Sequence, residues 1–241
     1  MTIRIAMWSG PRNISTAMMR AFENRPDCAV IDEPFYAAYL AKTGLDHPMR
    51  DEVLASQPQE WRVVAKALVT DRPAAVFYQK QMTHHMLPEF GLDWTRACRN
   101  AFLIRDPAAV LRSYSQKRAE VRLEDIGVVR QRELFEREAD RLGYAPAVIE
   151  GVDVLAAPQS ALSRLCEALG IEFCKEMLSW PSGRRPSDGV WAPAWYEAVE
   201  RSTGFEAQQP APRSVLPGNL QRIAELGRPH YEALARYRLR I

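Results

Sequence analysis

The first sixteen residues restrict the fold of this chain more than any other segment. Residues 3–8, IRIAMW, read as a buried strand, and residues 14–24 have the apolar spacing of a helix. The intervening SGPRNIST segment makes a glycine turn and places a hydroxyl pair at the helix start. Backbone N–H groups and the helix dipole converge on such a junction, which makes it a cradle for a phosphate group. The cradle residues are Gly10, Pro11, Arg12, Asn13, Ile14, Ser15 and Thr16.

This cradle lacks the lysine of a Walker loop. No second glycine and no lysine precede Ser15, so Arg12 supplies the fixed positive charge and its forked donors. The absence argues against the usual magnesium-assisted hydrolysis of a nucleotide. From these residues alone a plainer interpretation stays open, in which Asn13 caps an ordinary helix and Ser15 and Thr16 belong to its first turn.

Further short apolar runs alternate with helix-period segments. Residues 29–32, 74–79, 100–104 and 147–150 read as strands. Short buried strands separated by helices indicate a parallel sheet that is covered on both faces. We therefore expect an α/β fold of the P-loop NTPase type, with three layers and a central parallel sheet of about five strands. Ligands of such sheets bind at the carboxyl ends of the strands.

The length of the chain is compatible with one domain. It has 241 residues, of which 47% are hydrophobic, and we expect residues 1–241 to form a single domain. Residues 178–217 are rich in Pro, Gly, Trp and Arg and read as an irregular lid or binding excursion, with one short helix near 194–202. Residues 216–239 return to helical spacing, and Pro229 is expected to split them into two C-terminal helices.

Charge and cysteine content limit the partners of the chain. With 32 basic and 30 acidic residues the net charge is +2, which gives no drive toward nucleic acid or an acidic membrane. No signal segment and no apolar run of membrane-spanning length is present, so we expect a cytoplasmic protein, either a monomer or a homodimer. No CxxC spacing occurs, and the cysteines are expected to be small buried hydrophobes: Cys28, Cys98, Cys166 and Cys174.

A second anion site is predicted where the strand at 100–104 ends. Arg105 follows the strand, Asp106 and Pro107 start a helix, and Ser113 lies two turns along it. Helical side chains lean toward the N-terminus, so Arg105 and Ser113 can reach one anion. Taken singly, each has a plainer interpretation, as a surface ion pair for Arg105 and a solvated helix residue for Ser113.

Together the two junctions resemble the sulfotransferases that use 3′-phosphoadenosine-5′-phosphosulfate. GPRNISTAMM is similar to their 5′-phosphosulfate loop of the Pro-Arg-Ser-Gly-Ser-Thr type, with Asn13-Ile14 in place of Ser-Gly. Arg105, its Asp-Pro neighbours and Ser113, eight residues later, fit their 3′-phosphate motif. AVIEGVDVLAAPQSALSRLCEALGIEF resembles their downstream strand and helix, so the resemblance covers about residues 3–173. The chain also resembles the sulfotransferase-like domain that some plant and fungal proteins fuse to an aminotransferase-like domain.

The resemblance also implies the groups around the transferred sulfuryl. Glu33 resembles the glutamate that serves as base in several relatives, and Asp32 is the weaker candidate. Lys80 is placed to contact the sulfate, while His84 and His85 come later than the histidine base of other relatives. The two adjacent histidines, if they lay on a strand, would point to opposite faces, which argues against a metal site.

Two arginines in the excursion extend the list of candidate ligands. Relatives close a basic loop over the 3′-phosphate and the adenine, and Arg184 and Arg185 are expected either to do this or to line the acceptor pocket. A loop that is clamped by packing of Trp191, Trp195 and Tyr196 is the alternative.

The resemblance therefore implies a sulfotransferase that takes 3′-phosphoadenosine-5′-phosphosulfate as donor and leaves adenosine 3′,5′-bisphosphate as product. Its partner is a small hydroxyl or amine acceptor, and no metal is required. Two alternatives remain open, a small-molecule P-loop kinase and a non-catalytic nucleotide-binding module. The missing Walker lysine counts against the kinase.

Overall fold

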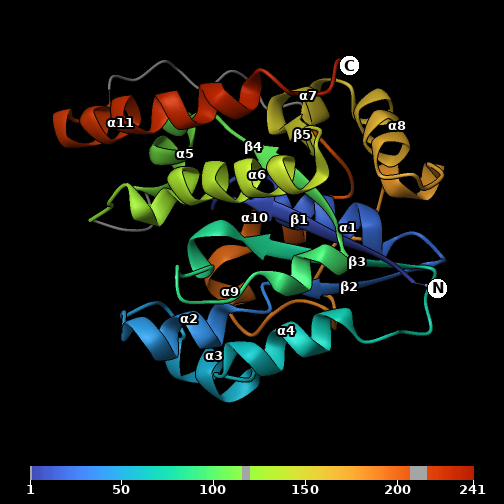
Figure 1. The fold of residues 1–241 in the computed structure, drawn as a ribbon, viewed down its shortest axis with the longest axis horizontal. Coiled ribbons are helices and arrows are strands. Elements are labelled where there is room, and N and C mark those ends of the chain that lie inside the picture. The colour runs from blue at the N-terminus through green and yellow to red at the C-terminus, as the bar shows by residue number, and fades with distance from the viewer. Residues whose placement is uncertain (1, 116–119, 207–215) are drawn as a thin grey trace.

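A five-stranded parallel sheet forms the centre of the molecule (Figure 1). The computed structural model describes residues 2–115, 120–206 and 216–241. The strands lie in the order β2-β3-β1-β4-β5, and all four pairings are parallel. Their bounds are β1 Ile3–Ser9, β2 Cys28–Asp32, β3 Val76–Met82, β4 Arg99–Ile104 and β5 Ala147–Glu150. The predicted α/β fold with a parallel sheet of about five strands is confirmed.

Helices cover both faces of this sheet. The α-helices are α1 Ser15–Glu23, α2 Tyr36–Thr43, α3 Arg50–Ser56, α4 Trp61–Val69, α5 Pro107–Tyr114, α6 Val128–Leu142, α7 Gly151–Ala156, α8 Pro158–Ala168, α9 Ala192–Trp195, α10 Glu197–Arg201 and α11 Gly218–Ala235. Short 3₁₀ turns are η1 Thr83–His85, η2 Asp93–Ala97, η3 Glu124–Ile126 and η4 Lys175–Leu178. Among the described residues, no helix is long and apolar enough to cross a membrane.

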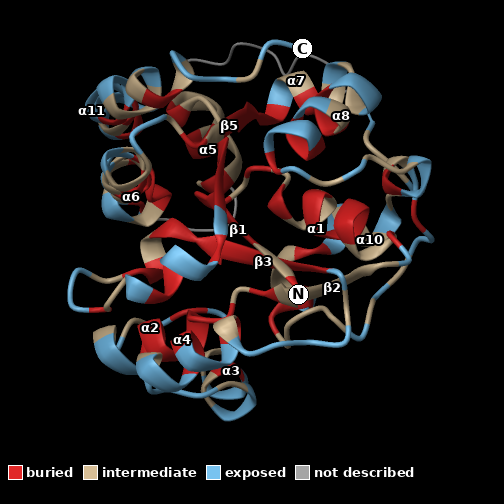
Figure 2. Ribbon diagram, turned by 45° about the vertical axis from the view of Figure 1, so that its right-hand side comes forward, coloured by how far each residue is buried: buried red, intermediate tan, exposed pale blue. Residues whose placement is uncertain are grey.

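Successive side chains of β1 point to opposite faces of the sheet, so they contribute to two layers of the core. Ile5 and Met7 pack with α1 and α8 on one face, whereas Ala6 and Trp8 pack with α4, α6 and the end of α11 on the other. All four residues are fully buried, as expected for a central strand covered on both sides. Figure 2 shows the buried residues concentrated on the strands and on the inward sides of the helices.

Strand order places a binding crevice beside β1. The segment after β1 leads into α1 on one face of the sheet, whereas the segment after β4 leads through α5 to α6 on the other. Connections that leave neighbouring parallel strands toward opposite faces open a crevice at the carboxyl edge. The Arg12 loop and Arg105 both lie at this edge.

The C-terminal segment differs from the prediction. Pro229 does not split it, because α11 runs unbroken from Gly218 to Ala235. A proline removes one backbone hydrogen bond, but Pro229 is exposed, so water can satisfy the freed carbonyl. Burial of Leu220, Ala224 and Leu234 on one side keeps the helix continuous across the proline.

Residues 179–204 of the excursion form a closed loop. Ser179 and Gly204 form an antiparallel bridge at its base, and the backbone N–H of Trp180 donates to the Thr203 carbonyl at 3.0 Å. It carries two short helices, α9 and α10, where one was predicted near 194–202. The part of the predicted excursion at 207–215 lies outside the described residues.

Candidate functional site

A cavity of about 470 Å³ lies at the carboxyl edge of the sheet. Its lining comes from residues 11–16 of the loop at 10–16, called the phosphate loop below, from the ends of β2 and β3, from α7 and α10, and from residues 202–206 of the excursion. Its lining includes most of the predicted site residues: Pro11, Arg12, Asn13, Ile14, Ser15, Thr16, Glu33, Lys80, His84, Arg105 and Ser113. Gly10 lies just behind the lining, where a Cβ atom would come within 2.5 Å of the Ile126 carbonyl oxygen.

The phosphate loop leaves the start of α1 uncapped. Ile14 is the N-cap residue, it has a left-handed backbone, and within the described part of the chain no side-chain cap hydrogen bond forms at this helix start. The interpretation that Asn13 caps this helix is wrong, because its amide instead donates to the Leu103 carbonyl at 2.8 Å. The free N–H groups of the first turn, the Ser15 and Thr16 hydroxyls and the helix dipole therefore remain available to an anion.

Backbone strain is concentrated at this cavity. Non-glycine residues with positive φ, among those described, are Arg12 at 55°, Ile14 at 38°, Glu33 at 40° and Met49 at 61°. The first three line the cavity. A β-branched residue such as Ile14 adopts such a backbone rarely, at a cost of about 1–3 kcal/mol. Strain of this kind is typical of functional sites.

Two arginines and a serine link the phosphate loop to α5. The Arg12 Nε donates to the Ser113 Oγ at 3.0 Å, and the Arg105 guanidinium donates to the Arg12 carbonyl. Burial lowers the pKa of Arg12, and burial together with the charge of Arg12 lowers the pKa of Arg105. A bound anion would relieve both effects, because an opposite charge favours the cationic form of each guanidinium. The two predicted anion sites thus form one continuous surface.

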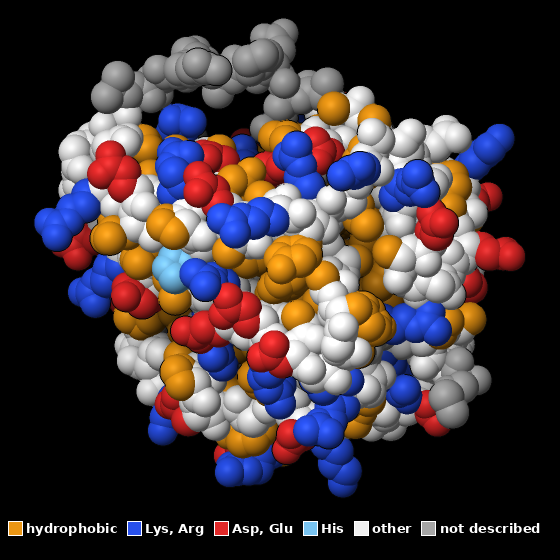
Figure 3. All heavy atoms as spheres, turned by 45° about the horizontal axis from the view of Figure 1, so that its top comes forward, with side chains coloured by type: hydrophobic (Ala, Val, Ile, Leu, Met, Phe, Trp, Pro, Cys, Tyr) orange, Lys and Arg blue, Asp and Glu red, His pale blue; other side chains and the backbone are white. Residues whose placement is uncertain are grey.

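This positive charge is local. Over the face of the molecule that Figure 3 presents, basic and acidic side chains alternate without a large patch of one sign. The net charge of +2 agrees with that distribution.

The other side of the cavity holds a buried ammonium group between two carboxylates. Lys80 Nζ lies 2.8 Å from Asp32 Oδ1, 2.7 Å from Glu33 Oε1 and 2.5 Å from the Tyr196 hydroxyl. Burial opposes its charge, but the two carboxylates outweigh it, so the pKa of Lys80 is raised. An ammonium has three donors, and all three have partners here. In this arrangement Lys80 has no donor left for the predicted contact with a sulfate.

The two carboxylates differ in what they can still accept. Asp32 accepts a hydrogen bond from Lys80 on Oδ1. Its Oδ2 accepts from the Tyr196 hydroxyl at 2.7 Å and from the Gly189 N–H at 3.1 Å. Glu33 accepts from Lys80 on Oε1, and the Tyr196 hydroxyl lies 3.4 Å from the same oxygen. Burial raises the pKa of Glu33, against the opposing effect of the Lys80 charge. Glu33, which lines the cavity, is therefore the better placed of the two to accept a proton.

Aromatic and imidazole rings form the wall beside this centre. Tyr36 stacks on His85 with ring centroids 4.5 Å apart, its hydroxyl lies 2.9 Å from His47 Nδ1, and His84 meets His85 edge-on at 4.3 Å. The expectation that the two adjacent histidines point to opposite faces of a strand is wrong. β3 ends at Met82, so both lie in the η1 turn and line the cavity. Burial, followed by the neighbouring imidazoles, lowers the pKa of His85 well below its usual value.

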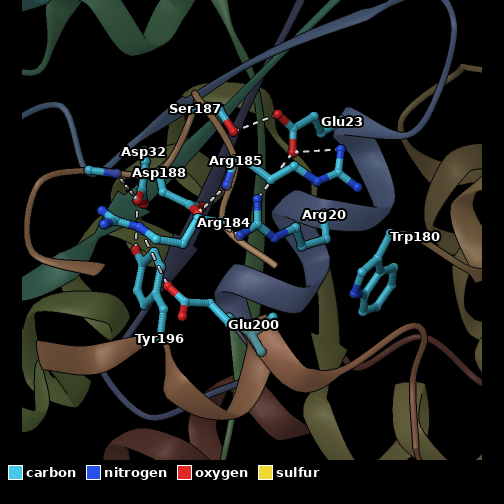
Figure 4. Close-up of polar contacts among 12 residues, drawn as sticks. Arg20, Glu23, Asp32, Trp180, Arg184, Arg185, Ser187, Asp188, Tyr196 and Glu200 are labelled. Atoms are coloured by element: carbon cyan, nitrogen blue, oxygen red, sulfur yellow. Dashed lines mark hydrogen bonds and ion pairs between the residues drawn. The ribbon is translucent and has the colours of Figure 1, made fainter. Parts of the chain in front are cut away.

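The structure does not bring Arg184 and Arg185 to the cavity. Arg184 pairs with Glu200 at 3.8 Å, and Arg185 pairs with Glu23 at 3.5 Å (Figure 4). Neither belongs to the cavity lining. The clamped loop is what forms instead, because Trp191 is buried against Tyr36 with ring centroids 5.1 Å apart. Carboxylates on α1 and α10 thus neutralise the charges that were predicted to meet the nucleotide.

Comparison with known families agrees with this geometry. The family model described as "Sulfotransferase domain" matches residues 3–236. The chain belongs to this sulfotransferase family. Two curated relatives from Arabidopsis thaliana are similar to it, at 35% identity over 95% of this chain and 33% over 87%. They are branched-chain-amino-acid aminotransferase-like proteins 1 and 2, and this sulfotransferase domain spans about two fifths of their lengths, 41% and 37%.

Solved structures share the fold of this sulfotransferase domain. The sulfotransferase domain from the curacin biosynthetic pathway matches with a TM-score of 0.56 at 18% identity, over 94% of this chain and 97% of that one. The sulfotransferase domain from the Synechococcus PCC 7002 olefin synthase matches with a TM-score of 0.53 at 16% identity, over 93% and 94%.

Sequence reasoning missed part of the cavity. It assigned no role to Tyr36, His47 or Leu155, and it gave Tyr196 no partner. Tyr36 follows Glu33 by three residues at the same sheet edge, so its position could have indicated it. Nothing local marks Tyr196, which reaches Asp32 and Lys80 from 164 and 116 residues away in the sequence.

Proposed function

We propose that this protein transfers a sulfuryl group from 3′-phosphoadenosine-5′-phosphosulfate to the hydroxyl or amine of a small acceptor. One observation carries the proposal: a single cavity holds both an arginine-lined phosphate loop and a carboxylate with a raised pKa. Sulfuryl transfer needs cations around the leaving phosphate and a base for the acceptor proton.

The donor fits the residues at the loop. The uncapped first turn of α1, with Ser15, Thr16 and Arg12, would hold the 5′-phosphosulfate. Arg105 and Ser113 would hold the 3′-phosphate, and the pKa of Arg105, lowered by burial and by Arg12, supports an anion at that point. When bound, the donor supplies an electrophilic sulfur whose bond to the bridging oxygen of the 5′-phosphate breaks as the acceptor oxygen or nitrogen attacks.

On the acceptor side, Glu33 takes the proton. Its Oε1 is fixed by Lys80 at 2.7 Å, and its other oxygen accepts no hydrogen bond from the described residues. A raised pKa brings the basicity of a carboxylate closer to neutral pH, where proton transfer is most effective. Tyr36, His84 and His85 form the adjacent wall, against which the acceptor would lie.

Ligand-induced stabilisation tests the donor, because a ligand that binds only the folded state raises the free energy of unfolding by about 2.7 kcal/mol at 100 times its Kd. Adenosine 3′,5′-bisphosphate should raise Tm and Mg-ATP should raise it far less. Greater stabilisation by Mg-ATP would favour a kinase. Binding of the bisphosphate without transfer of ³⁵S to any acceptor in a panel of phenols, alcohols and amines would leave a non-catalytic nucleotide-binding module.

A further inference from the structure

Tyr196 contributes the most heavily engaged hydroxyl at the site. It is 4% exposed and comes from the excursion, directly after α9. Its oxygen lies 2.5 Å from Lys80 Nζ, 2.7 Å from Asp32 Oδ2, 3.0 Å from Trp191 Nε1 and 3.4 Å from Glu33 Oε1.

The chemistry of these neighbours fixes the direction of each hydrogen bond. An ammonium and an indole N–H can only donate, so the hydroxyl accepts from Lys80 and from Trp191. Its own hydrogen must then go to a carboxylate, and Asp32, at 2.7 Å, is closer than Glu33. One hydrogen is donated and two are accepted, which uses the full capacity of the hydroxyl.

These bonds hold Lys80, and Lys80 in turn holds Glu33. Asp32 and Tyr196 occupy two of the three ammonium donors, which leaves the third directed at Glu33 Oε1. Without the Tyr196 hydroxyl, one ammonium donor would be buried without an acceptor, and the ammonium could turn away from Glu33.

The excursion itself is anchored so that Tyr196 reaches this point. The Asp188 carboxylate pairs with Arg20 at 2.6 Å, and the next N–H, from Gly189, donates to Asp32. Ser187 adds a bond to Glu23 at 2.5 Å. Figure 4 shows Asp188, Ser187 and Tyr196 directed from the excursion toward residues of α1 and the end of β2.

We propose that Tyr196 is a positioning residue for the transfer reaction, which acts by holding the Lys80 ammonium and thereby orienting the Glu33 carboxylate toward the acceptor. The role rests on the proposed function. It does not require Tyr196 to touch the donor or the acceptor.

The test compares Tyr196→Phe with a matched control, Tyr231→Phe. Tyr231 also donates its hydroxyl to a buried carboxylate, that of Glu150, but it lies outside the cavity. For the wild type and both variants we would measure the Kd of adenosine 3′,5′-bisphosphate by calorimetry and ³⁵S transfer to 4-nitrophenol from pH 5 to 9. Heteronuclear NMR would follow the ¹⁵N signal of the Lys80 ammonium.

In Tyr196→Phe we expect nucleotide affinity within about twofold of the wild type and an unchanged KM for 4-nitrophenol. Turnover should fall by roughly 10–100-fold, the size expected when a catalytic group is displaced by about 1 Å. The acidic limb of the pH profile should move to higher pH, because a Lys80 ammonium that turns away no longer stabilises the charged form of Glu33. The Lys80 signal should broaden or vanish, while Tyr231→Phe keeps the wild-type signal, affinity and turnover.

The outcomes separate this role from the function on which it rests. A Tyr196→Phe protein with wild-type turnover, pH profile and Lys80 signal overturns the role and leaves the function intact. Equal losses in Tyr196→Phe and Tyr231→Phe also overturn it, because they would reflect general damage to the fold. A wild type that neither binds the bisphosphate nor transfers ³⁵S to any acceptor removes the proposed function and this role with it.

Discussion

Removal of one partner of the buried Arg20–Asp188 ion pair should strongly destabilise the fold. Both side chains are completely buried, and the closest distance between them is 2.6 Å. Arg20→Met would leave Asp188 buried, and among the described residues only the backbone N–H of Arg185, at 2.8 Å, would still donate to its carboxylate. Removing one partner of a buried pair costs about 3–5 kcal/mol, because the other charge stays out of water. Total stabilities are about 5–15 kcal/mol, so this is a large fraction.

Urea denaturation measures this loss directly, as a lower midpoint with an unchanged m value. For a chain of this length, the same loss would lower Tm by roughly 6–20 °C. Arg164→Met is the matched control, because the Arg164–Glu167 pair has a similar distance of 3.0 Å but side chains that are 59% and 71% exposed. An exposed pair contributes about 0–1 kcal/mol.

A double variant sharpens the test. Arg20→Met combined with Asp188→Leu removes both charges, so it should be more stable than Arg20→Met alone. The reasoning would be refuted if Arg20→Met lost no more stability than Arg164→Met. It would also be refuted if the second substitution added a further loss.

Three further predictions concern the cavity. Glu33→Gln should reduce turnover by roughly 10²–10⁴ and leave bisphosphate affinity nearly unchanged; full activity with a genuine acceptor would transfer the role of base to a histidine such as His84. Arg105→Ala should weaken adenosine 3′,5′-bisphosphate about 10–100-fold by calorimetry and adenosine 5′-monophosphate far less, whereas equal weakening would make Arg105 a purely structural support of the loop. Because burial lowers the pKa of His85 below its ordinary 6.5, the unfolded chain binds a proton that the folded chain does not, so stability should fall as pH drops below about 6.5. His85→Phe should flatten that dependence in urea titrations between pH 5 and 7.5, and an unchanged slope would assign it to other groups.

Strands could be predicted from the sequence because burial on both faces gives them a continuous apolar run. The predicted strand at 147–150 has the observed bounds of β5, and the predicted strand at 100–104 misses only Arg99 of β4. Pro229 shows the opposite case, because tertiary packing keeps a helix continuous where the proline alone predicted a break. Gly227, two residues earlier, packs against Pro107 and Val128. The packing of a continuous α11 therefore stabilises the fold by more than the loss of one backbone hydrogen bond at Pro229 destabilises it.

Residues that line the cavity could be predicted where a single segment of the sequence contains the whole motif. The phosphate loop follows a strand directly, and Arg105 and Ser113 share one strand end and one helix. The positive charges of Arg184 and Arg185 were visible in the sequence, but their ion-pair partners were not. Those partners, Glu200 and Glu23, are not adjacent to them in the sequence. The same distance hides Tyr196, whose contacts exist only after the excursion has folded back.

The charges of the cavity explain why Lys80 does not take the place of the missing Walker lysine. Lys80 lies between Asp32 and Glu33, so the three groups together carry a formal charge of −1. Arg12 in the phosphate loop and Arg105 after β4 give this part of the cavity lining a formal charge of +2. A lysine that is already held by two carboxylates cannot replace a phosphate-binding cation. The cavity therefore carries positive charge at Arg12 and Arg105 and negative charge around Lys80, which is the distribution that the proposed transfer needs for a leaving phosphate and a proton-accepting base.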